Sequence, residues 1–161
     1  MNISELLIPE LKHETERNEA FFKRVPADKL EWAPHEKSMP MGKLCAHIVE
    51  LYGWIPPTMN VDTFDMATYQ APEQADPETL ITRLHELAPA AEQALQKDND
   101  TYFKTWTMKH GDKVLMEMPR YTAIRTMVMN QFPHHRAQLG VYLRLLGVDV
   151  PATYGPSADE S

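Results

Sequence analysis

The sequence predicts an all-α protein, a four-helix bundle with one short hairpin or irregular excursion before its last helix. Two observations carry this prediction. Four long segments repeat apolar residues at the spacing of one helix face, about 100° per residue. One stretch, residues 101–119, breaks that spacing and is typical of a β-hairpin. At 161 residues the chain is about the size of one domain, and we expect a single domain over residues 1–161.

The first helix is predicted over about residues 4–25, and Pro26 ends it because proline disfavours helical geometry in the residue before it. Its inward stripe is apolar except for Glu14 and Asn18. Polar groups on a core-facing stripe are costly unless they are paired or bound to something. Glu14 and Asn18 are therefore candidates for binding substrate or for acid–base catalysis. The alternative is that they pair with His or Arg side chains in a structural role.

The second helix is expected to start at Ser38, a good N-cap, and to stop at Pro56-Pro57. Residues 58–75 then form a long loop. Asp76-Pro77-Glu78 provides the cap, the first-turn proline and the acidic first turn that are typical of a helix start. Pro89 is expected to kink this third helix.

The fourth helix is predicted over about residues 121–146, with Gly147 in the position that follows a helix. Its inward stripe contains three polar residues, Gln138 as well as Gln131 and His135, and the last two lie one turn apart on one face. Pro133 between them should bend the helix. Arg136 is expected to point outward and to form ion pairs at the surface.

Histidine also lies on the inward face of the second helix, at His47. Two histidines and a third oxygen or nitrogen donor can hold Zn²⁺ or a similar ion and leave a coordination position open, as catalytic sites do. His47, Gln131 and His135 are therefore the candidate metal ligands, although Gln131 offers only a neutral amide oxygen. From spacing alone, a hydrogen-bonded polar network in the core is the more common outcome of such a pattern.

Bulk properties exclude several classes of protein. A net charge of -7 argues against non-specific nucleic-acid binding, which needs a basic face. No apolar run approaches the roughly 20 residues of a membrane span, so we expect no membrane partner. Cys45 is the one cysteine and cannot form an internal disulfide, which favours the reducing cytoplasm.

Residues 134–139, 142–144 and 151–160 together resemble the C-terminal signature of the DinB family. This is the DinB/YfiT-like group of metalloenzymes, distinct from the DNA polymerase that shares the name. Residues 41–54 resemble the motif in the second helix of that family, and residues 30–34 match its exit from the first helix. The resemblance covers nearly the whole chain, and its C-terminal part is the most specific.

The resemblance implies up-down-down-up connectivity, a homodimer, and a divalent metal ion, zinc or nickel, held by three side chains. It matches His47, Gln131 and His135 to the three ligand positions. The position of Gln131 is His in many members and Glu in the related mycothiol-dependent isomerases, so this sequence departs from the pattern there. The neighbouring His134 would lie outside the ligand set or at the interface.

The resemblance also implies a class of chemistry. Some characterised relatives are thiol-dependent transferases or isomerases, so such a reaction, or hydrolysis, is expected on a small-molecule substrate, with a low-molecular-weight thiol as a second cofactor in the first case. The ion would lower the pKa of a bound water or thiol and so supply a nucleophile at neutral pH. The alternative is a non-catalytic small-molecule-binding or stress-related protein with a degenerate metal site.

Overall fold

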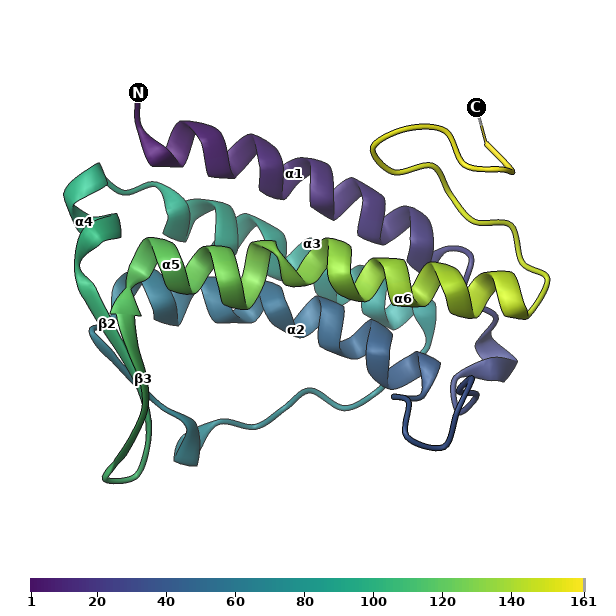
Figure 1. The fold of residues 1–161 in the computed structure, drawn as a ribbon, viewed down its shortest axis with the longest axis horizontal. Coiled ribbons are helices and arrows are strands. Elements are labelled where there is room, and N and C mark those ends of the chain that lie inside the picture. The colour runs from purple at the N-terminus through teal and green to yellow at the C-terminus, as the bar shows by residue number, and fades with distance from the viewer. Residues whose placement is uncertain (161) are drawn as a thin grey trace.

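Four long helical elements pack side by side in the computed structural model, which describes residues 1–160 (Figure 1). In chain order they are α1 (Ile3–Phe22), α2 (Met41–Asn60), α3 (Pro77–Leu95) and a composite last helix made of α5 (Arg120–Ile124), a π-helical turn (Arg125–Met129) and α6 (Gln131–Leu145). α1 and the composite helix run in one direction, and α2 and α3 run in the other. Each of α1 and α2 packs against both α3 and α6.

A three-stranded mixed sheet lies at one end of the helices. Strand β2 (Thr105–His110) pairs antiparallel with β3 (Lys113–Pro119) and parallel with β1 (Thr63–Asp65). A short helix, α4 (Asn99–Phe103), precedes β2. The hairpin turn contains Gly111 at φ 59°, the left-handed region that favours glycine. The backbone N–H of Gly111 donates to Asp65 Oδ1 at 3.0 Å, which ties the turn to β1.

The all-α fold class predicted from the sequence is therefore wrong, because the chain combines its helices with this mixed sheet. The expected loop over residues 58–75 supplies the third strand. β1 has only three residues, too few to show the alternation by which strands are found in a sequence. Its pairing is also non-local, with Thr63 opposite Thr107.

The second helix begins at Met41 and continues through Pro56 and Pro57 to Asn60, so the predicted limits of this helix are wrong. Its last turn has side-chain hydrogen bonds that a sequence pattern does not reveal. The nearly buried guanidinium of Arg120 donates to the carbonyl of Thr58 at 2.6 Å and to that of Val61 at 2.9 Å. Donors of this kind satisfy carbonyls at a helix end.

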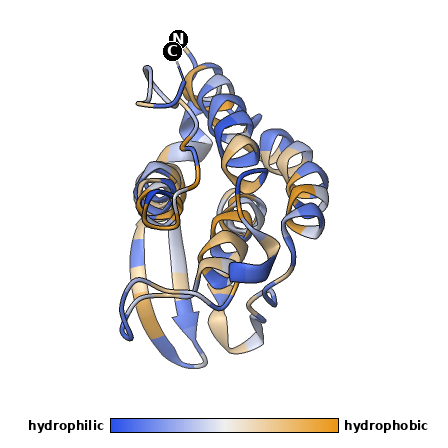
Figure 2. Cartoon of the chain, turned by 90° about the vertical axis from the view of Figure 1, so that its right-hand side faces the viewer, coloured by the Kyte–Doolittle hydropathy of each residue, from blue (hydrophilic) through white to orange (hydrophobic). Residues whose placement is uncertain are grey.

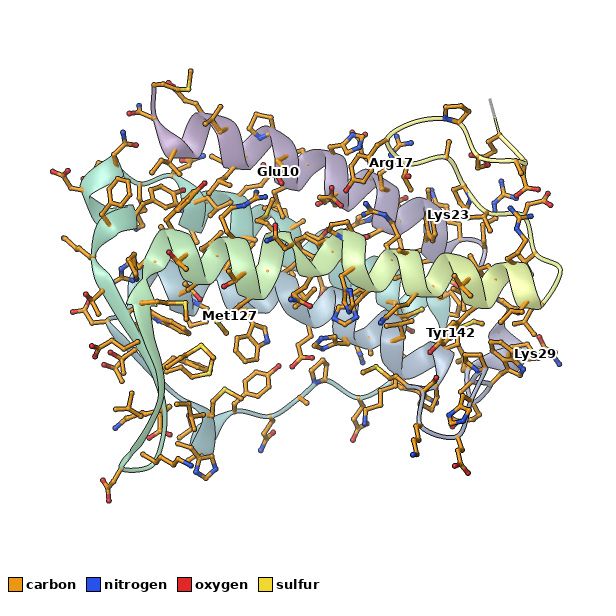
Figure 3. All side chains as sticks on the ribbon, viewed as in Figure 1. Glu10, Arg17, Lys23, Lys29, Met127 and Tyr142 are labelled. Carbon is orange, nitrogen blue, oxygen red and sulfur yellow. The ribbon has the colours of Figure 1, made fainter. Side chains whose placement is uncertain are left out.

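The last helix is interrupted where the sequence predicts continuity. The N–H of Asn130 donates to the carbonyl of Arg125 at 2.9 Å, a bond across five residues that is typical of a π-helical turn. Arg125 also bonds both carboxylate oxygens of Glu10 on α1, labelled in Figure 3, at 2.7 Å. Pro133 consequently lies in the first turn of α6, where its missing N–H would have no helical partner.

Several predicted helix ends are confirmed. Asp76 caps α3 by accepting a hydrogen bond from the N–H of Thr79 at 2.9 Å. Gly147, at φ 72°, follows the last helix. Each helix carries both hydrophobic and hydrophilic residues (Figure 2), and the apolar faces of the four long elements form one buried core. None of the described helices combines the length and the apolar content needed to cross a membrane.

Candidate functional site

Two histidines from different helices meet at the contact between α2 and α6. The ring centroids of His47 and His135 lie 4.7 Å apart, and the ring planes are nearly perpendicular at 80°. The prediction that these two residues approach each other is confirmed. Both side chains are half-buried at the edge of the core, so they remain accessible to a ligand from solvent.

His47 is oriented by a carboxylate on its own helix. Its Nδ1 lies 2.7 Å from Oε2 of Glu50, three residues further along α2. The other carboxylate oxygen of Glu50 accepts a hydrogen bond from the hydroxyl of Tyr69, in the segment after β1. Burial favours the protonated form of Glu50, but the hydrogen bonds from His47 and Tyr69 outweigh it, so its pKa is lowered. An ionised Glu50 therefore accepts from His47 Nδ1.

His135 is oriented in the same way by an amide. Its Nδ1 lies 3.0 Å from Oε1 of Gln138, and the amide nitrogen of Gln138 lies 3.3 Å from Nε2 of His134. This network is satisfied when Nδ1 of His135 carries the proton, because an amide oxygen can only accept. Burial lowers the pKa of His135; the hydrogen bond to Gln138 opposes this shift, and the adjacent His47 and His134 rings add to it. His135 is therefore neutral at pH 7.

The arrangement leaves the Nε2 atoms of His47 and His135 without a hydrogen bond within residues 1–160. When Nδ1 carries the proton, Nε2 keeps its lone pair, which is the form of imidazole that binds metal ions. Ligating histidines in metalloproteins typically donate their other ring N–H to a carboxylate or carbonyl oxygen. Glu50 and Gln138 contact the Nδ1 atoms of His47 and His135 in the same geometry.

The third predicted ligand, Gln131, is placed differently. Its side-chain nitrogen donates to the carbonyl of Thr126 at 3.0 Å, inside the π-helical turn. Over the described residues, no three side chains of the His, Cys, Asp and Glu types gather closely enough to hold a metal ion. Two imidazoles thus have the donor chemistry of a metal site, and a contribution from Gln131 stays a prediction.

The predicted catalytic residues, Glu14 and Asn18, are buried between α1 and α6. Arg136 Nη1 donates to Glu14 Oε2 at 2.5 Å and to Asn18 Oδ1 at 2.9 Å. The amide of Asn18 donates to the Tyr52 hydroxyl at 3.0 Å. The hydroxyl of Tyr154, in the C-terminal segment, donates to Glu14 and accepts from Arg136 Nη2. These bonds correspond to the structural alternative for Glu14 and Asn18.

The expectation that Arg136 points outward is wrong, since its side chain is only 2% exposed. The inner face of α6 is formed by Phe132, Arg136, Leu139 and Leu143, and His135 lies beside that face. The sequence prediction assumed a rotation of about 100° per residue through the π-helical turn as well. It therefore assigned the inner face of α6 to the wrong residues.

Glu50 and Tyr69 are the residues of the histidine cluster to which the sequence prediction gave no role. Gln138 was expected on the inward stripe and is instead exposed, with its amide oxygen 3.0 Å from Nδ1 of His135. The three-residue spacing from His47 to Glu50 is a signal that could have identified Glu50. No sequence signal brings Tyr69 to this cluster. Cys45 is buried, and burial raises the pKa of its thiol to about 12, so it fills the core as an uncharged group.

Comparison with known proteins gives one family and one architecture. The model of the DinB family matches residues 1–161. The uncharacterised protein YrdA of Bacillus subtilis (strain 168) is 28% identical over 122 residues, which are 74% of this chain and 69% of YrdA.

Three solved structures of DinB-like proteins share the fold. YjoA of Bacillus subtilis has a TM-score of 0.74 at 15% identity, covering 93% of this chain and 99% of that chain. A member of the family from Exiguobacterium sibiricum 255-15 has a TM-score of 0.69 at 18% identity, covering 94% and 97%. A protein from Bacillus cereus ATCC 10987 has a TM-score of 0.67 at 20% identity, covering 89% and 92%.

Proposed function

The chain belongs to the DinB family, and on that premise we propose that it binds a divalent metal ion, zinc or nickel, at His47 and His135 and acts as a metal-dependent enzyme on a small molecule. One observation carries the proposal. The two rings lie 4.7 Å apart, and each has its Nδ1 engaged by a partner while its Nε2 is uncommitted.

The residues of the histidine cluster would each have a separate role in a metal site. Glu50 fixes the ring orientation of His47 and holds the proton on its Nδ1, as carboxylates do beside ligating histidines. Gln138 fixes His135, and the lowered pKa of that ring keeps it unprotonated and competent to bind. Gln131 would complete the ligand set through its amide oxygen, and its neutral amide makes the site weaker than one with three imidazoles.

A bound ion would lower the pKa of a water or thiol bound to it, and the deprotonated group would be a nucleophile at neutral pH. Two classes of reaction use such a nucleophile in this setting: hydrolysis, and thiol-dependent transfer or isomerisation with a low-molecular-weight thiol as cofactor. The residue at position 131 favours neither class of reaction. It is Gln, whereas many DinB proteins have His there and the mycothiol-dependent isomerases have Glu. We further propose the homodimer that the resemblance implies.

Calorimetric titration with Zn²⁺ and Ni²⁺ tests the metal site on protein purified without a histidine tag. The wild-type chain should bind one ion, and His47→Ala and His135→Ala should each abolish binding. His85→Ala is the matched control, because His85 also contacts a carboxylate, Glu19 at 2.8 Å, yet stands apart from the pair. Wild-type protein that takes up neither ion would refute the metal site, as would equal losses in all three variants.

A second function, non-catalytic binding of small molecules, is favoured by a separate observation. Arg136 engages the two polar residues that were predicted to serve as acid or base, Glu14 and Asn18. If the protein binds Zn²⁺ or Ni²⁺ yet neither ion stimulates hydrolysis of an activated ester or transfer of a thiol, the binding function should replace the enzymatic one.

A further inference from the structure

A cavity of about 650 Å³ opens between α6 and the C-terminal segment, residues 148–160. In Figure 1 this segment is the yellow chain that turns back from the end of α6 toward α1. The walls are mainly apolar and come from α1, α6 and the C-terminal segment; they include Phe21, Ala137, Gly140, Val141, Val150 and Pro151. Cavities that bind small molecules typically have volumes of about 300–1,000 Å³ and apolar walls.

The outer wall is anchored at several points. Asp159 accepts hydrogen bonds from Arg144 Nη2 at 2.5 Å and from the N–H of Val150 at 2.9 Å. Arg24 Nη2 donates to Glu160 at 2.6 Å. These bonds hold the segment at a fixed distance from α6, so the cavity is part of the folded structure.

The cavity also has polar side chains in its lining. Arg136 lines it with a side chain that is 2% exposed. A guanidinium has five N–H donors, and the three hydrogen bonds of Arg136 to described residues go to Glu14, Asn18 and Tyr154. The two remaining N–H groups of this buried arginine have no hydrogen bond to residues 1–160.

Charge in the cavity is balanced. Glu14 neutralises Arg136, and Asp159 neutralises Arg144, the other arginine of the walls. An anionic ligand would add an unbalanced charge beside a buried ion pair, and a cationic ligand would face two guanidinium groups. A neutral ligand with a hydrogen-bond acceptor satisfies both the apolar walls and the free donors of Arg136.

We propose that this cavity is a binding site for a neutral, largely apolar small molecule that places a carbonyl oxygen against Arg136. The site is separate from the histidine pair. At about 100° per residue, the α6 residues that line it centre on the side of the helix opposite His135. Binding here should therefore be unaffected by Zn²⁺, Ni²⁺ or a chelator.

The test uses Prodan, a neutral naphthyl ketone whose fluorescence shifts to the blue in apolar surroundings. Prodan should bind saturably. Gly140→Leu should weaken binding by about tenfold or more, a loss of at least 1.4 kcal/mol, because a Cβ at Gly140 lies 3.4 Å from Phe21 and 3.6 Å from Val150. Gly53→Leu is the matched control, since a Cβ there meets nothing within 4 Å. Ala137→Phe, at an exposed position of the same wall, gives a second filled cavity if Gly140→Leu fails to fold.

Three results would overturn the proposal. The first is a failure of specific binding in the cavity. It would be seen either as the lack of a saturable blue shift with wild-type protein or as undiminished Prodan binding in both Gly140→Leu and Ala137→Phe. The second is tighter binding of the anionic dye ANS than of Prodan, which would assign the cavity to anions. The third is a dimer in sedimentation that dissociates on Leu145→Glu and binds Prodan only when dissociated, which would show that a second copy of the chain covers the cavity.

Discussion

Neighbouring residues of α6 belong to two polar clusters of opposite character. His135 meets His47 of α2 at the edge of the core, where both rings are half-buried and both Nε2 atoms are uncommitted. Arg136 meets Glu14 and Asn18 of α1 in the interior. One position along a helix, a turn of about 100°, separates the two environments.

The difference follows from the cost of burial. A buried charge is tolerated only with a partner and with hydrogen bonds, so Glu14 and Arg136 are committed to each other. A half-exposed imidazole can keep a free lone pair because solvent reaches it. The buried cluster is therefore expected to govern stability, and the exposed cluster is expected to govern metal binding.

The largest expected effect comes from breaking the buried pair. Arg136→Met leaves the carboxylate of Glu14 buried and unpaired, which should cost about 3–5 kcal/mol in the free energy of unfolding. Denaturant unfolding measures it. The double variant Glu14→Leu/Arg136→Met should lose much less, because neither charge remains. Arg125→Met, which breaks a half-exposed pair with Glu10, should cost no more than about 1 kcal/mol. Equal losses in Arg136→Met and Arg125→Met would refute the contrast.

A change beside the histidine pair should act on binding and leave stability nearly unchanged. Glu50→Gln removes the carboxylate that orients His47 and should weaken Zn²⁺ affinity by about 10–100-fold, the usual effect of losing such a partner. Calorimetry measures the affinity, and a thermal melt checks the fold. Glu19→Gln, beside the isolated His85, should leave the affinity unchanged. An unchanged affinity in Glu50→Gln would show that His47 is not a ligand through Nε2.

A third variant sharpens the comparison by adding a donor. Gln131→His should tighten Zn²⁺ or Ni²⁺ binding, because an imidazole is a better ligand than an amide oxygen. The substitution also removes the hydrogen bond to Thr126, so a small loss of stability is expected with it. If His47 and His135 are intact and calorimetry detects no gain, position 131 does not face the ion.

Helical periodicity in the sequence predicted the approach of His47 and His135, since each lies at a repeated apolar spacing on a long helix. Capping chemistry predicted the start of α3 at Asp76 and the glycine after α6. These features depend on residues close together in the chain. A hairpin within residues 101–119 was predicted and is formed by β2 and β3. The pairing of Thr63 with Thr107 depends on contacts that no local pattern contains, and for that reason β1, the strand that makes the sheet mixed, was missed.

The misplacement of Arg136 has a different cause. Glu14 and Asn18 on an inward face signalled that a polar partner must lie opposite them. The π-helical turn, Arg125–Met129, changes the rotation between successive residues, so the phase of the last helix could not be carried across it. The sequence predicted a bend at Pro133, but the irregular segment of the helix is the π-helical turn that precedes it. Pro133 lies after that turn, in the first turn of α6.

The smallest expected effect concerns the ion pair at the surface that anchors the C-terminal segment. The hydrogen bond from Arg144, helped by the N–H of Val150, lowers the pKa of Asp159 from 3.8 to about 2. A lowered carboxyl pKa means that the stabilisation is fully present above about pH 4 and is lost as the pH falls through 2. The chemical shift of the Val150 amide, measured by NMR, should therefore titrate with a midpoint near 2. Arg144→Met should move that midpoint up toward 3.8. A wild-type midpoint already near 3.8 would mean that Arg144 does not anchor the segment at Asp159. That result would leave the expectation for the buried pair of Arg136 and Glu14 unchanged.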